Sequence, residues 1–342
     1  MTGAVYDRGY RPYEGRRGGR ASARAALLRA SVRRALGIRR EWRQKVAPFV
    51  LLAIAVVPAI VNVGVKYLTR DTPARGVEFI TYRDYVGVSN ALLVFVALTA
   101  PDIMCPDRRQ RVLPLVFARP LTGLDYVVAK VGTMASILFA FSFIPQVVLF
   151  VGQMLVSNDG ALDYLRDNAE VLWQVPTAVA LLSLFYASIG VAISSLTTRR
   201  IVAGASIIAL FLITSITSAI LVGPQTTVVE GGDGSSGTVI VIPEQEEGFG
   251  SATSTTGFDA PPPQVGPRPF LVEIDADPSA APLLNLAGLP LVLRDVVFLG
   301  EVDPDHPMSG LNGAGLYAAG VYVLVVAACL ATLVVRYREV ER

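Results

Sequence analysis

Long apolar stretches without charged residues divide the chain into six predicted membrane spans. About 20 consecutive apolar residues are needed to cross the hydrocarbon core of a bilayer. A charge at the centre of such a helix costs roughly 2.5–3.5 kcal/mol on insertion scales, so spans exclude charged residues. The windows that meet these conditions, of which the second is short, are 48–65, 85–100, 131–156, 171–196, 201–222 and 311–335. The pattern predicts an all-α integral membrane protein with about six transmembrane helices.

Composition supports a membrane protein and offers little chemistry. The chain of 342 residues is 52% hydrophobic and 17% charged, whereas soluble domains carry about 25% charged residues. Its two cysteines, Cys105 and Cys329, are too few and too far apart to suggest a metal site or a disulfide framework. The single histidine, His306, lies in a polar loop, where we expect a solvated side chain and no metal or acid–base site.

Arginines predict the orientation of the chain in the membrane. With six spans, the basic leader, the connection between spans two and three, the turn between spans four and five, and the C-terminal tail fall on one side. The excess of Lys and Arg marks the cytoplasmic side. The connection that contains Lys66 and Arg70 is an exception, but the leader is far more basic. We therefore expect a multi-pass protein of the plasma (inner) membrane with both termini in the cytoplasm.

These boundaries divide the chain into four parts. Residues 1–46 are predicted to form a cytoplasmic leader with an interfacial helix, and residues 47–222 to hold transmembrane helices one to five. Residues 223–310 form a long, partly flexible extracytoplasmic loop, and residues 311–342 form the last transmembrane helix and a cytoplasmic tail. The leader is too long before its first apolar run to be the n-region of a signal peptide.

Part of the leader has the pattern of an amphipathic helix. Over residues 22–46, Leu28, Val32, Ala35, Trp42 and Val46 fall on one helical face. Arg33 and Arg40 lie off that face, so together with Trp42 they are expected at the surface of the anionic inner leaflet. The alternative is an arginine-rich tail drawn to lipid headgroups. A nucleic-acid-binding arm is not expected, because interleaved aromatic residues are lacking.

The extracytoplasmic loop has two parts of different composition. Residues 230–268 are rich in Gly, Ser, Thr and Pro and are predicted to be flexible. Two short β-prone runs, 238–242 and 270–274, can pair as a hairpin across this part. Residues 280–299 are apolar again, but prolines and Gly288 interrupt them, and Arg294 and Asp295 argue against a seventh span. We expect a broken pair of short helices that dips into the outer leaflet.

The connection between spans two and three is predicted to contain a short amphipathic helix. Asp107, which follows Pro106, is placed to cap its N-terminus. The apolar patch comprises Leu113, Leu115 and Val116, and Arg119 with Pro120 ends the helix. The alternative interpretation is a basic loop that serves only to fix topology.

The same connection resembles a loop of the membrane subunits of type-2 ABC exporters. The matching positions are Pro106, Asp107, Arg109, Val112, Leu113, Leu115, Arg119, Pro120, Leu121, Asp125, Tyr126 and Lys130. Arg111 departs from the pattern, because many members carry Gly there. The N-terminal segment 6–15 similarly resembles the leader of a bacterial subgroup of these permeases, and the basic stretch would be their interfacial elbow helix.

The resemblance implies a permease subunit that forms the translocation path and is not itself an enzyme. ATP would be bound by a separate P-loop ATPase, and the path would need a second permease copy or a related permease. The implied ATPase-coupling residues, within the loop 102–126, are Asp107, Arg108, Arg109, Leu113, Leu115, Arg119, Pro120, Asp125 and Tyr126. The chain contains no G-x-x-x-x-G-K-[ST] motif, so we expect no cofactor in this chain.

Other functions remain open from the sequence alone. A membrane-embedded enzyme would need His, paired acids or a serine–base arrangement within the spans, and none is present. An ion-driven transporter should show charges or repeated broken helices near the midplane, and Asp102 alone does not meet that expectation. A non-transporting scaffold or sensor with a permease-like fold is the main alternative. Polar residues within spans, such as Gln146, are expected to form interhelical hydrogen bonds.

Overall fold

The structure is a computed structural model. It describes residues 19–35, 42–69, 81–86, 89–110, 113, 121–157, 160–222, 229–230, 270–271, 280–304 and 306–341. These residues are almost entirely helical, as the apolar pattern predicts.

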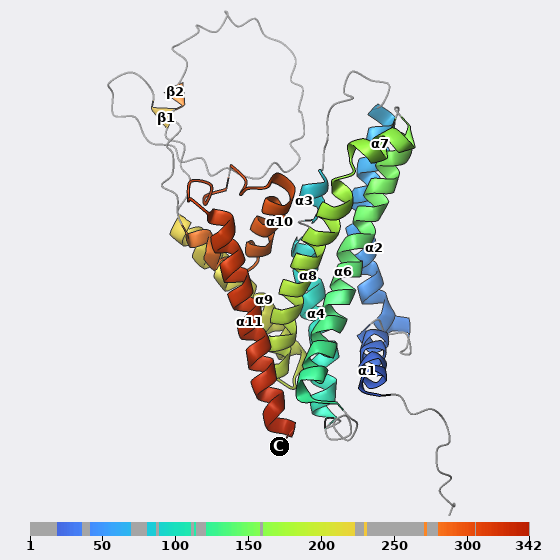
Figure 1. The fold of residues 1–342 in the computed structure, drawn as a ribbon, viewed down its shortest axis with the longest axis vertical. Helices are drawn as coiled ribbons and strands as arrows, with labels where there is room; N and C mark the ends of the chain where they lie inside the picture. The colour runs from blue at the N-terminus through green and yellow to red at the C-terminus, as the bar shows by residue number, and fades with distance from the viewer. Residues whose placement is uncertain are drawn as a thin grey trace, which may run out of the picture.

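Six long helices form the body of the molecule (Figure 1). They are α2 (Trp42–Thr69), α4 (Ser89–Arg109), α6 (Gly123–Val156), α8 (Val171–Leu196), α9 (Arg200–Val222) and α11 (Ala314–Glu341). Helix α8 lies at the centre, because it packs against α4, α6, α9 and α11. Its buried side chains, among them Leu182, Phe185 and Tyr186, therefore make up much of the apolar core.

Within the described residues, five helices are long and apolar enough to cross a membrane. They are α2, α6, α8, α9 and α11, which correspond to the predicted spans one, three, four, five and six. Helix α4 is 21 residues long and is not among the five. Its C-terminal half contains Asp102, Asp107 and Arg108. The fold is thus that of an all-α membrane-embedded protein.

Helix α4 differs most from its predicted span. The window 85–100 is replaced by a short helix, α3 (Tyr82–Val86), and by α4, which continues through Pro101 and Pro106 to Arg109. The prediction that Asp107 caps a new helix is therefore wrong, because Asp107 lies in the last turn of α4. Helix α4 fits closely between its neighbours: a Cβ on Gly190 of α8 would lie 2.7 Å from Val96 Cγ1, and a Cβ on Gly204 of α9 would lie 2.8 Å from the Ala97 carbonyl oxygen.

The interfacial helix is shorter than predicted. Helix α1 (Arg20–Ala35) ends where the predicted helix was to continue to Val46. Trp42 and Val46 instead belong to α2, so the first long helix begins before the predicted boundary at residue 47. In Figure 1, α1 is seen foreshortened beside α6 and α2, so it is steeply inclined to the long helices.

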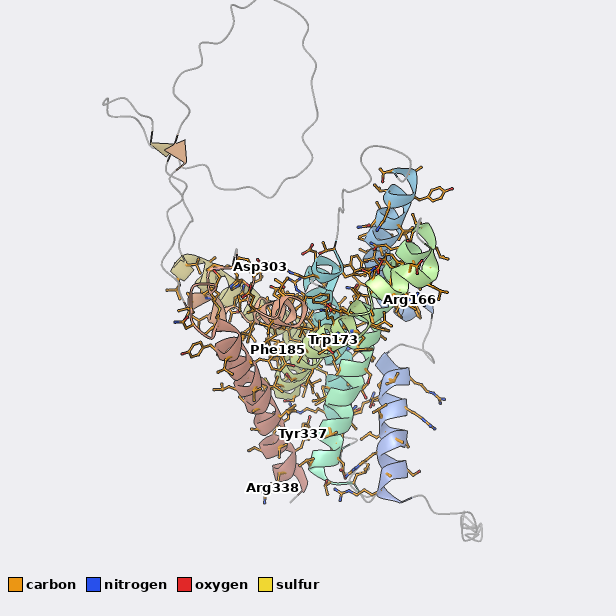
Figure 2. The ribbon with its side chains drawn as sticks, turned by 45° about the horizontal axis from the view of Figure 1, so that its top comes forward. Arg166, Trp173, Phe185, Asp303, Tyr337 and Arg338 are labelled. Carbon is orange, nitrogen blue, oxygen red and sulfur yellow. The ribbon has the colours of Figure 1, made fainter. Side chains whose placement is uncertain are left out.

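The two ends of the bundle carry different elements. The C-terminus of the chain, α1, the end of α4 and the start of α6 lie at one end, which we call the α1 end (Figure 1). At the other end, the α10 end, lie α3, α7 (Ala161–Asp167) and α10 (Leu289–Leu299). Figure 2 shows the same division, with Tyr337 and Arg338 near the α1 end and Arg166 and Asp303 near the α10 end.

The segment before α11 is a broken pair of short helices, as predicted. The 3₁₀ helix η1 (Ala281–Leu284) is followed by α10, and Asn285 lies between them. The Asn285 Oδ1 accepts hydrogen bonds from the backbone N–H groups of Ala287 and Gly288, each at 3.1 Å. Preceding them, β1 (Val229–Glu230) pairs antiparallel with β2 (Phe270–Leu271). The predicted pairing of residues 270–274 with residues 238–242 stays a prediction, because residues 238–242 lie outside the described residues.

Charged residues connect α10 to α3 at the α10 end. Arg83 of α3 pairs with Asp295 at 3.0 Å and with Asp303, and Arg294 pairs with Asp295 at 2.6 Å. Arg294 also donates to the backbone carbonyl of Arg83 at 3.0 Å. Arg294 and Asp295 are buried, and their mutual pairing explains how charged residues fit into this apolar segment.

Candidate functional site: an ion-pair junction of α1, α4 and α6

The residues that the sequence analysis singled out converge at the α1 end. The last turn of α4 and the first two turns of α6 lie next to each other, and α1 packs across both (Figure 1). The connection between α4 and α6, apart from Gln110, Leu113 and residues 121–122, lies outside the described residues. The junction is therefore built from the two helices that flank this connection.

The start of α6 is fixed by a capping box. The Thr122 side chain accepts from the backbone N–H of Asp125 at 3.3 Å, and Asp125 accepts in return from the backbone N–H of Thr122 at 3.1 Å. Such reciprocal bonds satisfy N–H groups that a helix start otherwise leaves without partners. The buried Asp125 carboxylate also pairs with Arg20 at 2.6 Å and Arg24 at 2.5 Å. Asp125, the third residue of α6, thus anchors the N-terminal half of α1.

A second buried carboxylate anchors the other end of α1. Asp107 of α4 pairs with Lys130 of α6 at 2.6 Å and with Arg34 of α1. The hydroxyl of Tyr126 donates to the same carboxylate at 3.0 Å. Lys130 is 1% exposed, and its ammonium group also donates to the Ile103 carbonyl at 3.1 Å. One carboxylate therefore joins three helices.

The energetics of this arrangement favour a fixed geometry. Burial of a charge is costly unless an opposite charge and hydrogen bonds compensate it, and removal of one partner leaves the other uncompensated. Both carboxylates meet these conditions, since each has two cationic partners and at least one further hydrogen bond. Helix α1 is held at two points, so it can move away from α4 and α6 only if these pairs break.

Further contacts fasten α4 to α8 and α9 at the same end. The Arg108 guanidinium donates to the carbonyl of Ser195, in the last turn of α8. A cation at this position complements the negative end of the helix dipole. Asp102 pairs with Arg200 at the start of α9. The C-terminal half of α4 thereby contacts four other elements through charged side chains.

The remaining predicted site residues are distributed differently. Arg109 is exposed at the end of α4, and Arg33 is exposed on α1. Leu113 is partly buried and packs against the apolar core. Trp42 is the first residue of α2, rather than part of the interfacial helix. The other predicted residues, Leu115, Arg119, Pro120 and Arg40, lie outside the described residues.

The sequence analysis missed most of the cations in the junction. Arg20, Arg24 and Arg34 were treated as members of a basic leader, and Lys130 as the residue that opens span three. One available signal was the Thr122-x-x-Asp125 spacing, which is typical of a capping box. Another was Lys130, a charge one turn after Tyr126 within an otherwise apolar helix, which needs an acidic partner.

The junction is suited to mechanical coupling. Its groups are ion-paired carboxylates, guanidinium groups and an ammonium group, which hold helices together. In the described part of the chain, no three His, Cys, Asp or Glu side chains lie close enough together to hold a metal ion.

Comparisons of the chain with protein-family models, curated proteins and solved structures found no match.

Proposed function

We propose that this chain is the membrane-spanning permease subunit of an ATP-driven exporter of the type-2 ABC class. The observation that carries the proposal is the ion-pair junction of α1 with α4 and α6. These pairs lie at both ends of the connection whose sequence resembles the ATPase-facing loop of such permeases. A force applied to that connection would therefore reach α1, α4 and α6 together.

The proposed mechanism has three steps. A separate P-loop ATPase binds ATP, and its closure pushes on the connection between α4 and α6. The junction transmits this displacement to the long helices, because the buried pair of Asp107 and Lys130 resists separation. The helices then rearrange around the translocation path, which a second permease copy or a related permease completes.

The proposal includes a topology. Helix α4 is the second of six spans, the α1 end is cytoplasmic, and α1 lies at the inner leaflet of the plasma (inner) membrane. The exposed arginines of α1, Arg29 and Arg33, are then placed to meet anionic lipid headgroups. The α10 end and the loop that contains β1 and β2 are extracytoplasmic.

Arg109 is the best residue for a test of the coupling surface. It lies at the end of α4 and is exposed, so its replacement should not disturb the core. Asp107 is unsuitable for this purpose, because it is buried and paired with Lys130. Arg338 is a matched control, since it is an exposed arginine at the α1 end (Figure 2).

The experiment compares Arg109→Glu with Arg338→Glu. Each variant is purified with the ATPase that accompanies the wild-type protein, and ATP hydrolysis by the complex is measured in nanodiscs. We expect Arg109→Glu to weaken association with the ATPase or stimulation of its activity at least about tenfold, while Arg338→Glu behaves like the wild type. Equal behaviour of the two variants would contradict the coupling assignment. A scaffold without transport activity would retain partners and show no ATP-dependent movement of cargo.

A further inference from the structure

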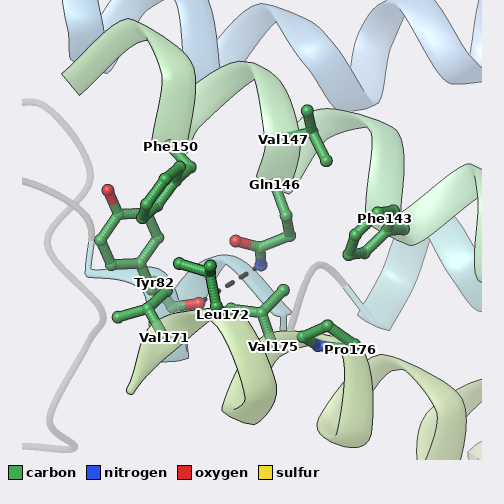
Figure 3. Close-up of a pocket in the computed structure, with 9 residues that line it drawn as sticks. All are labelled: Tyr82, Phe143, Gln146, Val147, Phe150, Val171, Leu172, Val175 and Pro176. Atoms are coloured by element: carbon green, nitrogen blue, oxygen red, sulfur yellow. Dashed lines mark hydrogen bonds between the residues drawn. The ribbon is translucent and has the colours of Figure 1, made fainter. Parts of the chain in front are cut away.

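A separate pocket lies at the α10 end, between α6, α8 and α3 (Figure 3). Its volume is about 140 Å³. The lining is mostly aromatic and aliphatic and comprises Tyr82, Phe143, Gln146, Val147, Phe150, Val171, Leu172, Val175 and Pro176. None of these residues takes part in the ion-pair junction.

One polar atom of the pocket lining, the side-chain oxygen of Gln146, lacks a hydrogen-bond partner among the described residues. Gln146 is 2% exposed, and its side-chain N–H group donates to the Tyr82 carbonyl at 3.3 Å. Its Oε1 atom has no hydrogen-bond partner among the described residues. Figure 3 shows the amide among the lining side chains, with the bond to Tyr82 on the nitrogen side. A buried acceptor without a donor is costly, so a ligand donor that reached Gln146 Oε1 from the pocket would be stabilised there.

The Tyr82 hydroxyl, which belongs to the lining of the pocket, does not supply that donor. The Tyr82 hydroxyl is bonded to Gln153 at 2.8 Å and to the Tyr164 hydroxyl at 2.6 Å. Tyr82 therefore presents its ring and its backbone carbonyl toward Gln146. A water molecule is a poor occupant, because buried waters need two to four polar partners, and the rest of the lining is mostly apolar.

Size and lining define the ligand class. A cavity of about 150 Å³ lined by apolar side chains accommodates a benzene-sized group, and this pocket is of similar volume. Phe143 and Phe150 provide aromatic walls. Leu172 and Val147 at its edge are 53% and 41% exposed, which places the opening on the side of the bundle where apolar side chains face outward.

We propose that this pocket binds a lipophilic ligand that inserts a benzene-sized apolar group and donates one hydroxyl or amide hydrogen bond to Gln146 Oε1. The ligand enters from the membrane past Leu172 and Val147. Recognition therefore combines apolar burial with a single donor. The site does not depend on the proposed ATPase coupling, because it lies at the opposite end of the bundle and shares no residue with the junction.

The first test uses two probes of which only one can donate a hydrogen bond. Binding of 4-hexylphenol and of its methyl ether, 4-hexylanisole, is measured by titration calorimetry with the full chain in nanodiscs. Empty nanodiscs correct for partition into the lipid. We expect the phenol to bind roughly threefold to tenfold more tightly, the range that corresponds to one neutral hydrogen bond. Equal affinity of the two probes, or no binding beyond partition, would overturn the proposal.

Two variants locate the site. Gln146→Met removes the acceptor and should bring the phenol down to the affinity of the ether. Val147→Phe places a ring at the mouth of the pocket and should weaken both probes at least about tenfold. Ile144→Phe is the matched control, because Ile144 is exposed on α6 and does not line the pocket.

The outcomes of the variants are distinct. Undiminished binding to Val147→Phe would show that the probes bind elsewhere and would overturn the proposal even if Gln146→Met failed to fold. A loss of binding in Ile144→Phe equal to that in Val147→Phe would do the same. An effect of either pocket variant on probe binding without an effect on ATPase association would separate this site from the coupling junction.

Discussion

The buried pair of Asp107 and Lys130 yields a quantitative prediction about stability. The perturbation is Asp107→Leu, which removes the carboxylate and leaves the Lys130 ammonium group 1% exposed and without its anion. Breaking a buried ion pair by removing one partner costs about 3–5 kcal/mol. The Tyr126 hydroxyl and Arg34 also lose their acceptor, so the cost should lie toward the upper part of this range.

A second replacement should restore much of this loss. Lys130→Met substitutes an apolar side chain of similar length, and exchange of a complete buried pair for apolar residues is often neutral or stabilising. Arg34 is partly exposed, so its guanidinium can turn toward water. The double variant should therefore be more stable than Asp107→Leu alone.

The assay is thermal unfolding of the purified proteins in one detergent. The unfolding entropy is about 2.1 cal/mol/K per residue, or about 0.7 kcal/mol/K for a chain of 342 residues, so Asp107→Leu should lower the apparent melting temperature by roughly 4–7 °C. The control is Asp163→Leu, which removes the exposed, 3.6 Å pair with Arg166. Exposed pairs contribute about 0–1 kcal/mol, so this variant should change the melting temperature little.

An Asp107→Leu variant as stable as the wild type would contradict a stabilising pair. A double variant that loses as much stability as the two single variants added together would contradict it as well. In either case, Asp107 and Lys130 would not form the energetically coupled pair that joins α4 to α6.

Two further predictions concern packing and topology. Gly204→Ala should destabilise the protein by about 1–3 kcal/mol in the same thermal assay, because its Cβ would lie 2.8 Å from a backbone oxygen of α4. The control is Gly132→Ala, whose Cβ would meet nothing within 4 Å, so this variant should be neutral or slightly stabilising. Equal effects of the two variants would contradict the close approach of α9 to α4. A cysteine at Leu162, in a background without the two native cysteines, should react with a membrane-impermeant maleimide on intact cells, and one at Arg338 only after lysis; the reverse pattern would invert the proposed orientation.

Charge-free windows predicted the limits of α8 and α9 accurately. Helix α8 begins and ends at the predicted residues, and α9 begins one residue early. These helices are flanked by charged or polar turns, so the ends of their apolar windows coincide with the ends of the helices. The prediction that Gln146 forms an interhelical hydrogen bond is also confirmed, by its bond to the Tyr82 carbonyl.

Helix α4 was mispredicted because its polar residues have partners that the sequence does not reveal. Pro101 and Asp102 were read as the end of a span, and Asp107 as the start of another helix. In the structure, Asp102 pairs with Arg200 and Asp107 with Lys130. Ion pairs of this kind offset the cost of the charges, so the helix can continue through them. They depend on tertiary contacts, which the hydrophobic pattern of the sequence does not show.

The candidate site was predicted in part. The resemblance named Asp107, Asp125 and Tyr126, but not their ion-pair partners in α1. Those partners are 73 and 105 residues away along the chain, for Arg34 and Arg20 respectively. Many arginines in the leader were equally plausible partners, and the choice among them follows from how α1 packs on α4 and α6.

The most direct test of the proposed function is purification of the tagged wild-type protein from gently solubilised native membranes, with mass spectrometry of the proteins that accompany it. We expect a soluble P-loop ATPase in near-stoichiometric amount, whose association is lost with Arg109→Glu and retained with Arg338→Glu. Recovery of intact, folded protein without any ATPase would contradict the account and favour a scaffold or an ion-driven transporter.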